Sequence, residues 1–449
     1  MTTCDVVVLG LGPGGEAVAT KLAGAGLDVV AVDQRLVGGE CPYYGCVPSK
    51  MMIHAALHVA EARRVPGSVE VRPDWGPVAR RIREEATDDW DDAVAVKRLE
   101  DAGVRFVRGH GRLTGVGRVE VDGSTYDASR GVVLNTGTEP AVPPVEGLAD
   151  TPYWTNRDAV AVTDLPASLV VVGGGAIGCE LAQAFARFGV GVTVVEMADR
   201  LLAAEEPEAS RLVADAFGAE GIQVRTGVQV RSVAHADGTF TVDLGDQRNG
   251  ADLLRTDKLL VATGRRPNLA DIGLESVGLD PSARALETDE RMSVGEKLWA
   301  IGDITGKGAF THMSMHEADV AVRAILDRDG PWADYRAVPR VTFTDPEVGA
   351  VGMTQRQADE AGVAVRTASG DLGTRGWIAE REGLVKLVAD TDRGVLVGGT
   401  VAGPAGGEVL GLLSLAVHAQ VPIDTLASMV YAYPTYHRAV LPVVEELAG

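Results

Sequence analysis

The sequence predicts an α/β protein in which two domains of the same doubly wound type are followed by a C-terminal α+β domain. An apolar strand, a glycine-rich turn and a helix follow one another twice, at residues 5–25 and again at residues 169–188. Both units lead into a second apolar strand that ends in an acidic residue, Asp33 or Glu196. From about Tyr335 the pattern changes to alternating strands with two helical stretches. We therefore expect two Rossmann-like, dinucleotide-binding domains and one further domain.

The first glycine-rich turn has the spacing of a dinucleotide-binding fingerprint. Gly10, Gly12, Gly14 and Gly15 lie between a predicted strand and a predicted helix, and Asp33 ends the next strand. Glycines allow the backbone to approach a pyrophosphate, the helix N-terminus binds it, and the carboxylate accepts the ribose hydroxyl. The context of strand and helix makes this a specific signal, whereas the three glycines alone would be a weak one.

The second fingerprint repeats this spacing with Gly173, Gly175 and Gly178. Glu196 then stands where a 2′-phosphate would otherwise lie, and its carboxylate favours NAD over NADP. Arg200 follows four residues later and keeps NADP possible.

Three shorter elements indicate how the domains are joined. Apolar strands run into Thr136-Gly137 and into a matching Thr-Gly pair that ends at Gly264. A third strand leads into Gly302-Asp303 and is expected to complete the first domain, which the second domain interrupts. The predicted domains are residues 1–155, the first part of one dinucleotide-binding domain; 156–282, a second dinucleotide-binding domain; 283–334, the remainder of the first; and 335–449, the α+β domain.

Residues 38–50 contain two cysteines at the predicted start of a helix. Cys41 and Cys46 are five positions apart with a glycine between them, so they can close a small disulfide. A helix N-terminus offers unpaired N–H groups and a positive dipole end, which favour a thiolate. Two unrelated buried thiols and a structural disulfide are the alternatives. The neighbouring fingerprints and the lack of an expected export signal favour a redox-active pair.

A metal site is not predicted. The other two cysteines, Cys4 and Cys179, are single and distant, whereas cysteine-based sites usually use four ligands. His312 and His316 have helical i, i+4 spacing, but the sequence offers no evident third ligand.

Charge and hydropathy exclude several classes of partner. A formal net charge of −21 over 449 residues argues against binding nucleic acid or an anionic membrane surface. No apolar run approaches the roughly 20 residues of a membrane helix. The chain enters an apolar strand at once without a basic segment, so we expect no signal peptide and a cytoplasmic location.

The whole chain, and residues 38–50 most specifically, resembles the FAD-dependent pyridine nucleotide-disulfide oxidoreductases, a family that includes dihydrolipoamide dehydrogenase, glutathione reductase and mercuric reductase. The resemblance implies FAD in the first domain, NAD in the second and a homodimer built through the third. It also implies hydride transfer between nicotinamide and flavin N5, followed by electron transfer to a Cys41–Cys46 disulfide.

The resemblance further implies a role for each residue of the site. Cys46 would lie next to the flavin, Cys41 would exchange with substrate, and Lys50 beside flavin N5 would pair with Glu180. The implied FAD contacts are Gly10, Gly12, Gly14, Gly15, Asp33, Gly39, Lys50, Thr136, Gly137, Gly302 and Asp303. The implied NAD contacts are Gly173, Gly175, Gly178, Glu196 and Gly264.

The C-terminal segment departs from the family pattern His-Pro-Thr-x-x-Glu. Tyr433 replaces the histidine that serves as acid and base, and Arg438 replaces the glutamate. A tyrosine with a pKa near 10 is a poor base at neutral pH. His437 is either a displaced base or an ordinary polar histidine of the interface. The chain also lacks the C-terminal cysteine pair of mercuric reductases, which disfavours mercury as substrate.

These departures leave the electron acceptor open. An atypical small disulfide or dithiol is the first expectation. Quinones or other non-thiol acceptors are the alternative, and a non-catalytic redox-sensing flavoprotein is a third. Tyr43 and Tyr44, between the two cysteines, are bulkier than is common there and either pack locally or narrow a substrate channel.

Overall fold

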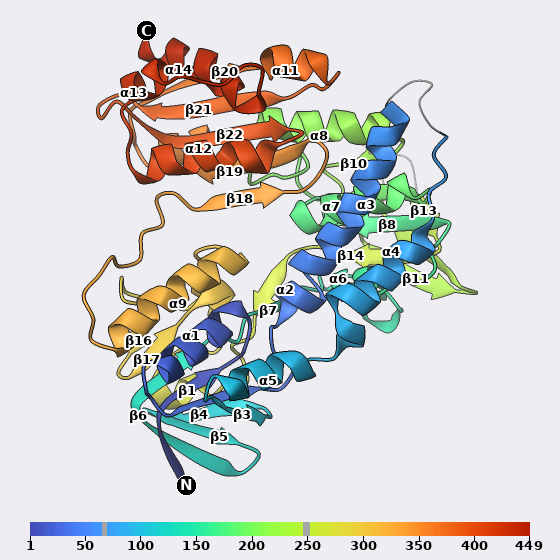
Figure 1. The fold of residues 1–449 in the computed structure, drawn as a ribbon. Helices are drawn as coiled ribbons and strands as arrows, with labels where there is room; N and C mark the ends of the chain where they lie inside the picture. The colour runs from blue at the N-terminus through green and yellow to red at the C-terminus, as the bar shows by residue number, and fades with distance from the viewer. Residues whose placement is uncertain (65–69, 246–251) are drawn as a thin grey trace. The chain divides into compact units, whose positions relative to one another are not determined.

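The computed structural model describes residues 1–64, 70–245 and 252–449 (Figure 1). The chain forms two compact units. The first unit comprises residues 1–49, 80–141 and 265–335, and the second comprises residues 50–79, 142–264 and 336–449. Within the described residues, no helix combines the length and apolar character that a bilayer-spanning segment needs.

The first unit is built on a mainly parallel sheet with strand order β16-β17-β6-β1-β2-β3. Its strands are β1 (Thr2–Leu9), β2 (Val29–Asp33), β3 (Arg105–Arg108), β6 (Ser124–Leu134), β16 (Ser293–Gly295) and β17 (Leu298–Ala300). Strand β17 pairs in parallel with β6, with Leu298 opposite Val132. This pairing confirms the prediction that the third strand–glycine–acid element completes the first Rossmann-like sheet after a long insertion.

Both faces of this sheet are covered, which explains the continuous apolar run of β1. Val6 and Val8 face a core shared with helices α1 (Pro13–Gly24), α5 (Ala93–Asp101) and α9 (Thr311–Ile325). Val7 and Leu9 face a second core, shared with the antiparallel strands β4 (Gly111–Gly115) and β5 (Arg118–Val121). A strand buried on both sides needs no polar alternation. Helices α1 and α9 pack side by side on one face (Figure 1).

The second unit contains a parallel sheet of order β10-β9-β8-β14 and a separate antiparallel sheet, β11-β12-β13. The parallel strands are β8 (Ser168–Val172), β9 (Gly191–Val195), β10 (Gln223–Arg225) and β14 (Lys258–Val261). The antiparallel strands are β11 (Ser232–Ala236), β12 (Thr239–Asp243) and β13 (Leu253–Thr256). Helices α6 (Asn156–Val160), α7 (Ala176–Arg187) and α8 (Pro207–Ala219) accompany them. The strand–turn–helix unit β8–α7 is the second predicted fingerprint.

The C-terminal part of the second unit is an antiparallel sheet with helices, which confirms the α+β prediction. Its order is β18-β19-β22-β21-β20. The strands are β18 (Pro339–Thr342), β19 (Glu347–Gly352), β20 (Val365–Gly370), β21 (Leu384–Asp390) and β22 (Val395–Gly403). The helices are α10 (Gln355–Glu360), α11 (Gly373–Ile378), α12 (Gly406–His418), α13 (Ile423–Ser428) and α14 (Val440–Ala448). Helix α12 packs on β19 and β22, and α14 packs on β20 and β21.

Residues 78–101 are rich in charged residues, a pattern that predicts one helical stretch with a solvated face, but the structure interrupts this helix in its middle. Helix α4 (Trp75–Arg81) widens into a π-helical turn at Ile82–Ala86, and α5 begins only at Ala93. The Thr87 hydroxyl bonds back to the Ile82 carbonyl, and three residues at 88–90 then have positive φ. Residues 66–77 are polar and contain prolines, which predicts a connection without regular structure; part of this stretch lies outside the described residues, and its end belongs to α4.

The β8–α7 turn generates a stability prediction. A Cβ atom at Gly178 would lie 2.0 Å from the Gly173 carbonyl oxygen, whereas nothing lies within 4 Å of one at the exposed helical Gly218. Gly178→Ala should lower the free energy of unfolding by about 1–3 kcal/mol through overpacking. Gly218→Ala should raise it by about 0.5–1 kcal/mol, because alanine is the better helix former. Urea unfolding followed by circular dichroism measures both, and equal effects would contradict the packing argument.

Candidate active site

The predicted redox cysteines lie in a tight loop at the start of a long helix. Gly38 and Gly39 have positive φ angles of 108° and 66°, and they turn the chain into the short helix α2 (Glu40–Tyr43). Cys41 is half-buried in α2, and Cys46 is exposed as the first residue of α3 (Cys46–Arg64). The Cys46 Sγ lies 3.5 Å from the Thr311 hydroxyl at the start of α9. The positive end of the α3 dipole therefore lies at Cys46, where it favours a thiolate.

The two tyrosines between the cysteines belong to an aromatic cluster. Tyr43 is buried, and its carbonyl accepts a hydrogen bond from the Trp90 indole N–H at 3.1 Å. The Tyr44 ring stacks on Trp90 with centroids 6.5 Å apart. Burial raises the pKa of Tyr43 to about 12, so this phenol stays protonated at neutral pH. Local packing accounts for Tyr43 and ties the cysteine loop to the irregular turn at residues 88–90.

The glycines of the first turn allow neighbouring backbone segments to approach one another closely. Gly10 has φ +91°, and a Cβ there would lie 2.2 Å from the Asn135 carbonyl oxygen. A Cβ at Gly15 would lie 2.0 Å from the Gly10 oxygen, and one at Gly39 would lie 2.9 Å from the Gly12 Cα. Two glycine-bearing segments thus approach each other at the N-terminus of α1, where backbone N–H groups can bind a pyrophosphate. These residues fit the adenine-dinucleotide half of FAD.

Asp33 closes this turn from the end of β2. Its carboxylate accepts hydrogen bonds from the Leu11 and Arg35 backbone N–H groups, both at 2.7 Å. Burial raises its pKa. Gly14 faces another helix, because a Cβ there would lie 2.2 Å from the Ser314 hydroxyl on α9. Gly14 therefore permits the close packing of α1 on α9.

Asp303 is joined to the cysteine loop by a chain of polar contacts. Its carboxylate accepts a hydrogen bond from the Thr138 hydroxyl at 2.6 Å. Arg265 donates to both the hydroxyl and the carbonyl of Thr138, at 2.7 and 2.8 Å. The same guanidinium lies 3.5 Å from the Glu40 carboxylate, next to Cys41. Strands β7 (Thr138–Pro140) and β15 (Arg265–Pro267) pair antiparallel and hold these groups together.

Thr136 and Gly137 connect the end of β6 to this region. The Thr136 hydroxyl donates to the Asn268 carbonyl at 2.8 Å, and the Asn268 side-chain amide donates to the Thr136 carbonyl at 2.9 Å. Gly137 has φ +65° and accepts from the Asn268 backbone N–H. Thr136 thus has a structural contact in addition to its predicted cofactor contact.

A buried carboxylate that the sequence argument did not single out supports Gly302 and Asp303. Glu317 on α9 accepts from the Gly302 N–H at 2.6 Å, the Tyr335 hydroxyl at 3.0 Å and the Thr305 hydroxyl at 3.1 Å. Glu317 is 1% exposed. Desolvation, with a smaller contribution from the charge of Asp303, raises the pKa of Glu317 to about 7 despite these donors. Glutamate inside a helical stretch resembles a surface residue in sequence, so only its partners distinguish it.

The second glycine turn repeats the first. Gly173 has φ +112°, and Gly175 immediately precedes α7. The Glu196 carboxylate accepts from the Gly174 N–H at 2.5 Å and the Ala198 N–H at 2.6 Å. It is thereby held at the end of β9, where the predicted ribose contact would be made. Gly264 has φ +111° and is exposed after β14.

Arg200, which kept NADP possible, is directed to backbone carbonyls. Its guanidinium donates to the Ala203 carbonyl at 2.8 Å and lies 3.3 Å from the Asp199 carboxylate. Of Glu196 and Arg200, Glu196 is therefore the residue whose side chain bonds to the second glycine turn.

Lys50 and Glu180 form a direct ion pair in the second unit. The Lys50 ammonium lies 2.7 Å from one oxygen of Glu180, and the Phe343 backbone N–H donates to the other oxygen at 2.8 Å. Glu180 is 5% exposed, whereas the Lys50 side chain is 36% exposed. The ammonium also lies 4.8 Å from the centre of the Phe343 ring. The carboxylate is thus fixed on α7 while the ammonium keeps access to solvent or a ligand.

The C-terminal residues that replace the family's dyad lie at the surface of the α+β part. Tyr433 is 65% exposed, and the Arg438 guanidinium lies 5.6 Å from its ring centre. His437 is half-buried in a 3₁₀ turn (Tyr436–Ala439), with its ring 5.8 Å from that of Tyr431. His437 therefore has a packing contact of its own.

The other two cysteines are inert by position. Cys4 and Cys179 are buried, and burial raises the pKa of Cys4 to about 11 and that of Cys179 further. In the part of the chain that the structure describes, no group of three or more histidine, cysteine or acidic side chains is arranged to hold a metal ion.

The environment of Glu317 generates a pH prediction. A carboxyl whose pKa is raised from 4.5 to about 7 stays protonated in the folded state while the unfolded chain ionises. The free energy of unfolding should therefore fall by about 3 kcal/mol through this group as pH rises from about 4.5 to 7. Glu317→Gln removes the titration. Chemical unfolding across this range should show its stability rising relative to that of the native protein, and parallel pH profiles would contradict the assignment.

Comparison with known proteins identifies the family. The protein-family model described as pyridine nucleotide-disulphide oxidoreductase matches residues 4–324. The family model of its dimerisation domain matches residues 338–443. Dihydrolipoyl dehydrogenase of Halobacterium salinarum is 34% identical over 100% of this chain and 97% of its own. Mercuric reductase of Acidithiobacillus ferrooxidans is 34% identical over 96% of this chain and 80% of its own.

Solved structures agree. LpdA of Mycobacterium tuberculosis matches with a TM-score of 0.87 at 27% identity, covering 100% of both chains. The HOCl-induced flavoprotein disulfide reductase RclA of Escherichia coli, solved as a Cu(II) complex, matches with a TM-score of 0.86 at 25% identity over 99% of this chain and 100% of its own. With two family models that together span nearly the whole chain, this protein belongs to the pyridine nucleotide-disulphide oxidoreductases, flavoenzymes that use FAD and NAD(P)H.

Proposed function

We propose that this protein is an NADH:disulfide oxidoreductase of the dihydrolipoamide dehydrogenase type that acts on a small disulfide or dithiol. The observation that carries the proposal is the start of α3. Cys46 is its first residue, and Lys50, one turn later, pairs with Glu180. In the reductive direction, NADH, a proton and the substrate disulfide give NAD⁺ and a dithiol. When bound, FAD accepts the hydride of NADH and passes the electron pair to the Cys41–Cys46 disulfide.

The two cysteines divide the thiol chemistry between them. The Cys41 thiolate attacks one sulfur of the substrate, which releases the first thiolate and leaves a mixed disulfide. The Cys46 thiolate then attacks the Cys41 sulfur, which releases the second thiolate and restores the Cys41–Cys46 bond. Two protons, one from NADH oxidation and one from solvent, complete the dithiol. The α3 dipole and the nearby Thr311 hydroxyl support a thiolate at Cys46.

The arrangement around the second glycine turn favours NADH over NADPH. Glu196 is fixed by two backbone N–H groups, so a 2′-phosphate would meet a carboxylate that cannot easily turn away. Arg200 is engaged by carbonyls instead of pointing as a free cation to that position.

Reduction of non-thiol acceptors such as quinones is the second candidate. Tyr433 favours this candidate. A phenol in place of the usual histidine removes the base that disulfide exchange needs, whereas reduction of a quinone does not need that base. One relative is named mercuric reductase, so the family includes a member named for a non-thiol substrate. A non-catalytic redox sensor is the third candidate, and it requires that NADH does not turn the protein over.

The assembly and location that accompany this function are a homodimer and the cytoplasm. The match of residues 338–443 to the family's dimerisation domain supports the homodimer. A dimer would let each C-terminal segment serve its partner's cysteine pair.

The first prediction separates thiol from non-thiol acceptors. Cys41→Ser should lower NADH-dependent reduction of lipoamide about a thousandfold or more, because the exchanging nucleophile is lost. Reduction of a quinone by the same variant should stay near the native rate. Cys4→Ala, which removes a buried thiol distant in sequence from the loop, is the control and should retain both activities. Steady-state NADH oxidation measures them, and lipoamide reduction that survives in Cys41→Ser would contradict the proposed substrate class.

The second prediction concerns the replacement of the dyad. If His437 is the displaced base, His437→Gln should lower disulfide turnover about 100-fold, within the usual range for general bases. NADH:dye activity, which needs no thiol base, should not change. Tyr433→Phe provides the comparison, because it removes only the phenolic hydroxyl group and keeps the ring. Equal loss of both activities in His437→Gln would indicate a structural histidine and contradict a base at this position.

A further inference from the structure

One face of helix α7 is polar and buried, which is unusual for a helix that packs in a Rossmann-like unit. Glu180, Gln183 and Arg187 follow one another at i, i+3 and i+7, and their exposed fractions are 5%, 3% and 4%. All three contact the same short segment, residues 343–345, which follows β18. Buried polar groups are costly unless they are hydrogen-bonded, so this face has a specific partner.

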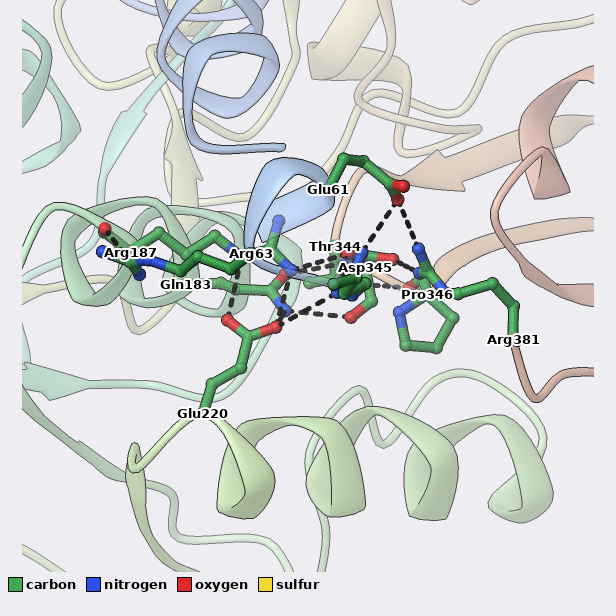
Figure 2. A network of polar contacts seen from close by, with 10 residues as sticks. Glu61, Arg63, Gln183, Arg187, Glu220, Thr344, Asp345, Pro346 and Arg381 are labelled. Carbon is green, nitrogen blue, oxygen red and sulfur yellow. Dashed lines mark hydrogen bonds and ion pairs between the residues drawn. The ribbon is translucent and has the colours of Figure 1, made fainter. Parts of the chain in front are cut away.

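Gln183 binds the backbone of Asp345 through both ends of its amide. The Asp345 N–H donates to the Gln183 side-chain oxygen at 2.7 Å, and the Gln183 side-chain N–H donates to the Asp345 carbonyl at 2.9 Å (Figure 2). The amide thus pairs with the segment as a neighbouring strand would. Two residues earlier, the Phe343 N–H donates to Glu180 at 2.8 Å.

The Asp345 carboxylate anchors the segment through arginines. Arg187 donates to one of its oxygens at 2.7 Å and Arg64 to the same oxygen at 2.6 Å, while Arg381 pairs with the other. Glu220 accepts from Arg187 at 2.6 and 2.8 Å, so that guanidinium is neutralised from two sides (Figure 2). Removing one partner from such a buried network would leave an uncompensated charge, which is strongly destabilising. Displacement of the segment is therefore costly in free energy.

Helix α3 is attached to the same segment at two places. Near its start, Lys50 contacts Glu180 and the Phe343 ring, and at its end Arg64 contacts Asp345. Three residues of chain thereby set the geometry between α3 and α7 where the ion pair forms.

We propose that Gln183 and Asp345 are positioning residues for the Lys50–Glu180 pair, acting through the Phe343 backbone N–H. Glu180 has one oxygen for Lys50 and one for Phe343, and it is buried, so loss of the Phe343 donor would leave a buried carboxylate oxygen without its partner. A shift of residues 343–345 would rotate the Glu180 carboxylate and thereby displace the Lys50 ammonium that is paired with it. The inference rests on the proposed function, in which this pair lies beside the reacting part of the cofactors.

The test compares holoenzyme variants in the reductive half-reaction. Gln183→Met keeps the volume and removes both bonds to Asp345, and Asp345→Asn keeps the shape and weakens the anchor. Lys386→Met is the matched control. Lys386 is also buried and bonds to Glu206 and Glu208 in the same unit. Among the described residues, it makes no hydrogen bond or ion pair with Glu180 or Phe343. Stopped-flow reduction by NADH and the midpoint potential of the bound flavin are measured for each.

Reduction should slow about tenfold in Gln183→Met and in Asp345→Asn, since small misplacements of a catalytic group cost one to two decades. The flavin potential should become more negative in both as the ammonium moves away, and neither quantity should change in Lys386→Met. In a Glu180→Gln background, Gln183→Met should cause no further slowing, because the two residues act through one path. If Gln183→Met fails to fold, Asp345→Asn alone gives the comparison.

Three results would overturn the inference. They are additive effects of the Gln183 and Glu180 substitutions, equal slowing in Lys386→Met, and native rates and potentials in both positioning variants. A native flavin that NADH does not reduce at all would overturn the proposed function and this inference with it. Normal reduction of the native enzyme, with variants that do not differ from it, would overturn this inference alone.

Discussion

In the proposed function, the chemistry of the second unit depends on the Glu180 carboxylate. A carboxylate that is 5% exposed needs donors for both oxygens, and it has one from Lys50 and one from the Phe343 backbone. An ion pair of this burial contributes little net stability and depends strongly on its geometry. The surroundings of Glu180 are polar, although well-packed apolar residues would often be at least as stable. This indicates a functional reason for the arrangement.

The first unit follows the same logic with backbone groups. Glycines at the end of β1 allow contacts that a Cβ would forbid, and Gly302 is held from behind by a buried carboxylate on α9. Asp303 is in turn connected through Thr138 and Arg265 to the loop of Cys41. A cofactor bound to this unit would therefore contact groups that support one another, and a displacement at one of them reaches the next.

Much of this was predictable from the sequence, and for identifiable reasons. Glycine spacing after an apolar strand depends on local backbone geometry, so both Rossmann-like turns and the strand at β17 could be placed without a structure. The cysteine loop is likewise local. Gln183, Arg187 and Glu317 could not be found, because polar residues within helices normally face solvent and only distant partners reveal their burial. The break near residue 88 was missed because the Trp90 bond to Tyr43 spans 47 positions.

The departure at Tyr433 divides the catalytic cycle into two parts with different requirements. In the proposed function, reduction by NADH involves the Lys50–Glu180 pair and needs no base, whereas disulfide exchange needs proton transfer at Cys41. The choice of electron acceptor depends on the second part, in which Tyr433 replaces the usual histidine. The buried thiols Cys4 and Cys179 cannot substitute, because burial keeps them protonated.

The central claim is that electrons from NADH reach the cysteine pair through the flavin, and anaerobic titration of the purified holoenzyme with NADH tests it most directly. The account predicts that the first equivalent produces a long-wavelength charge-transfer band with the flavin still largely oxidised, and that Cys46→Ser lacks this band. Complete bleaching of the flavin by the first equivalent, without such a band in the native enzyme, would contradict it.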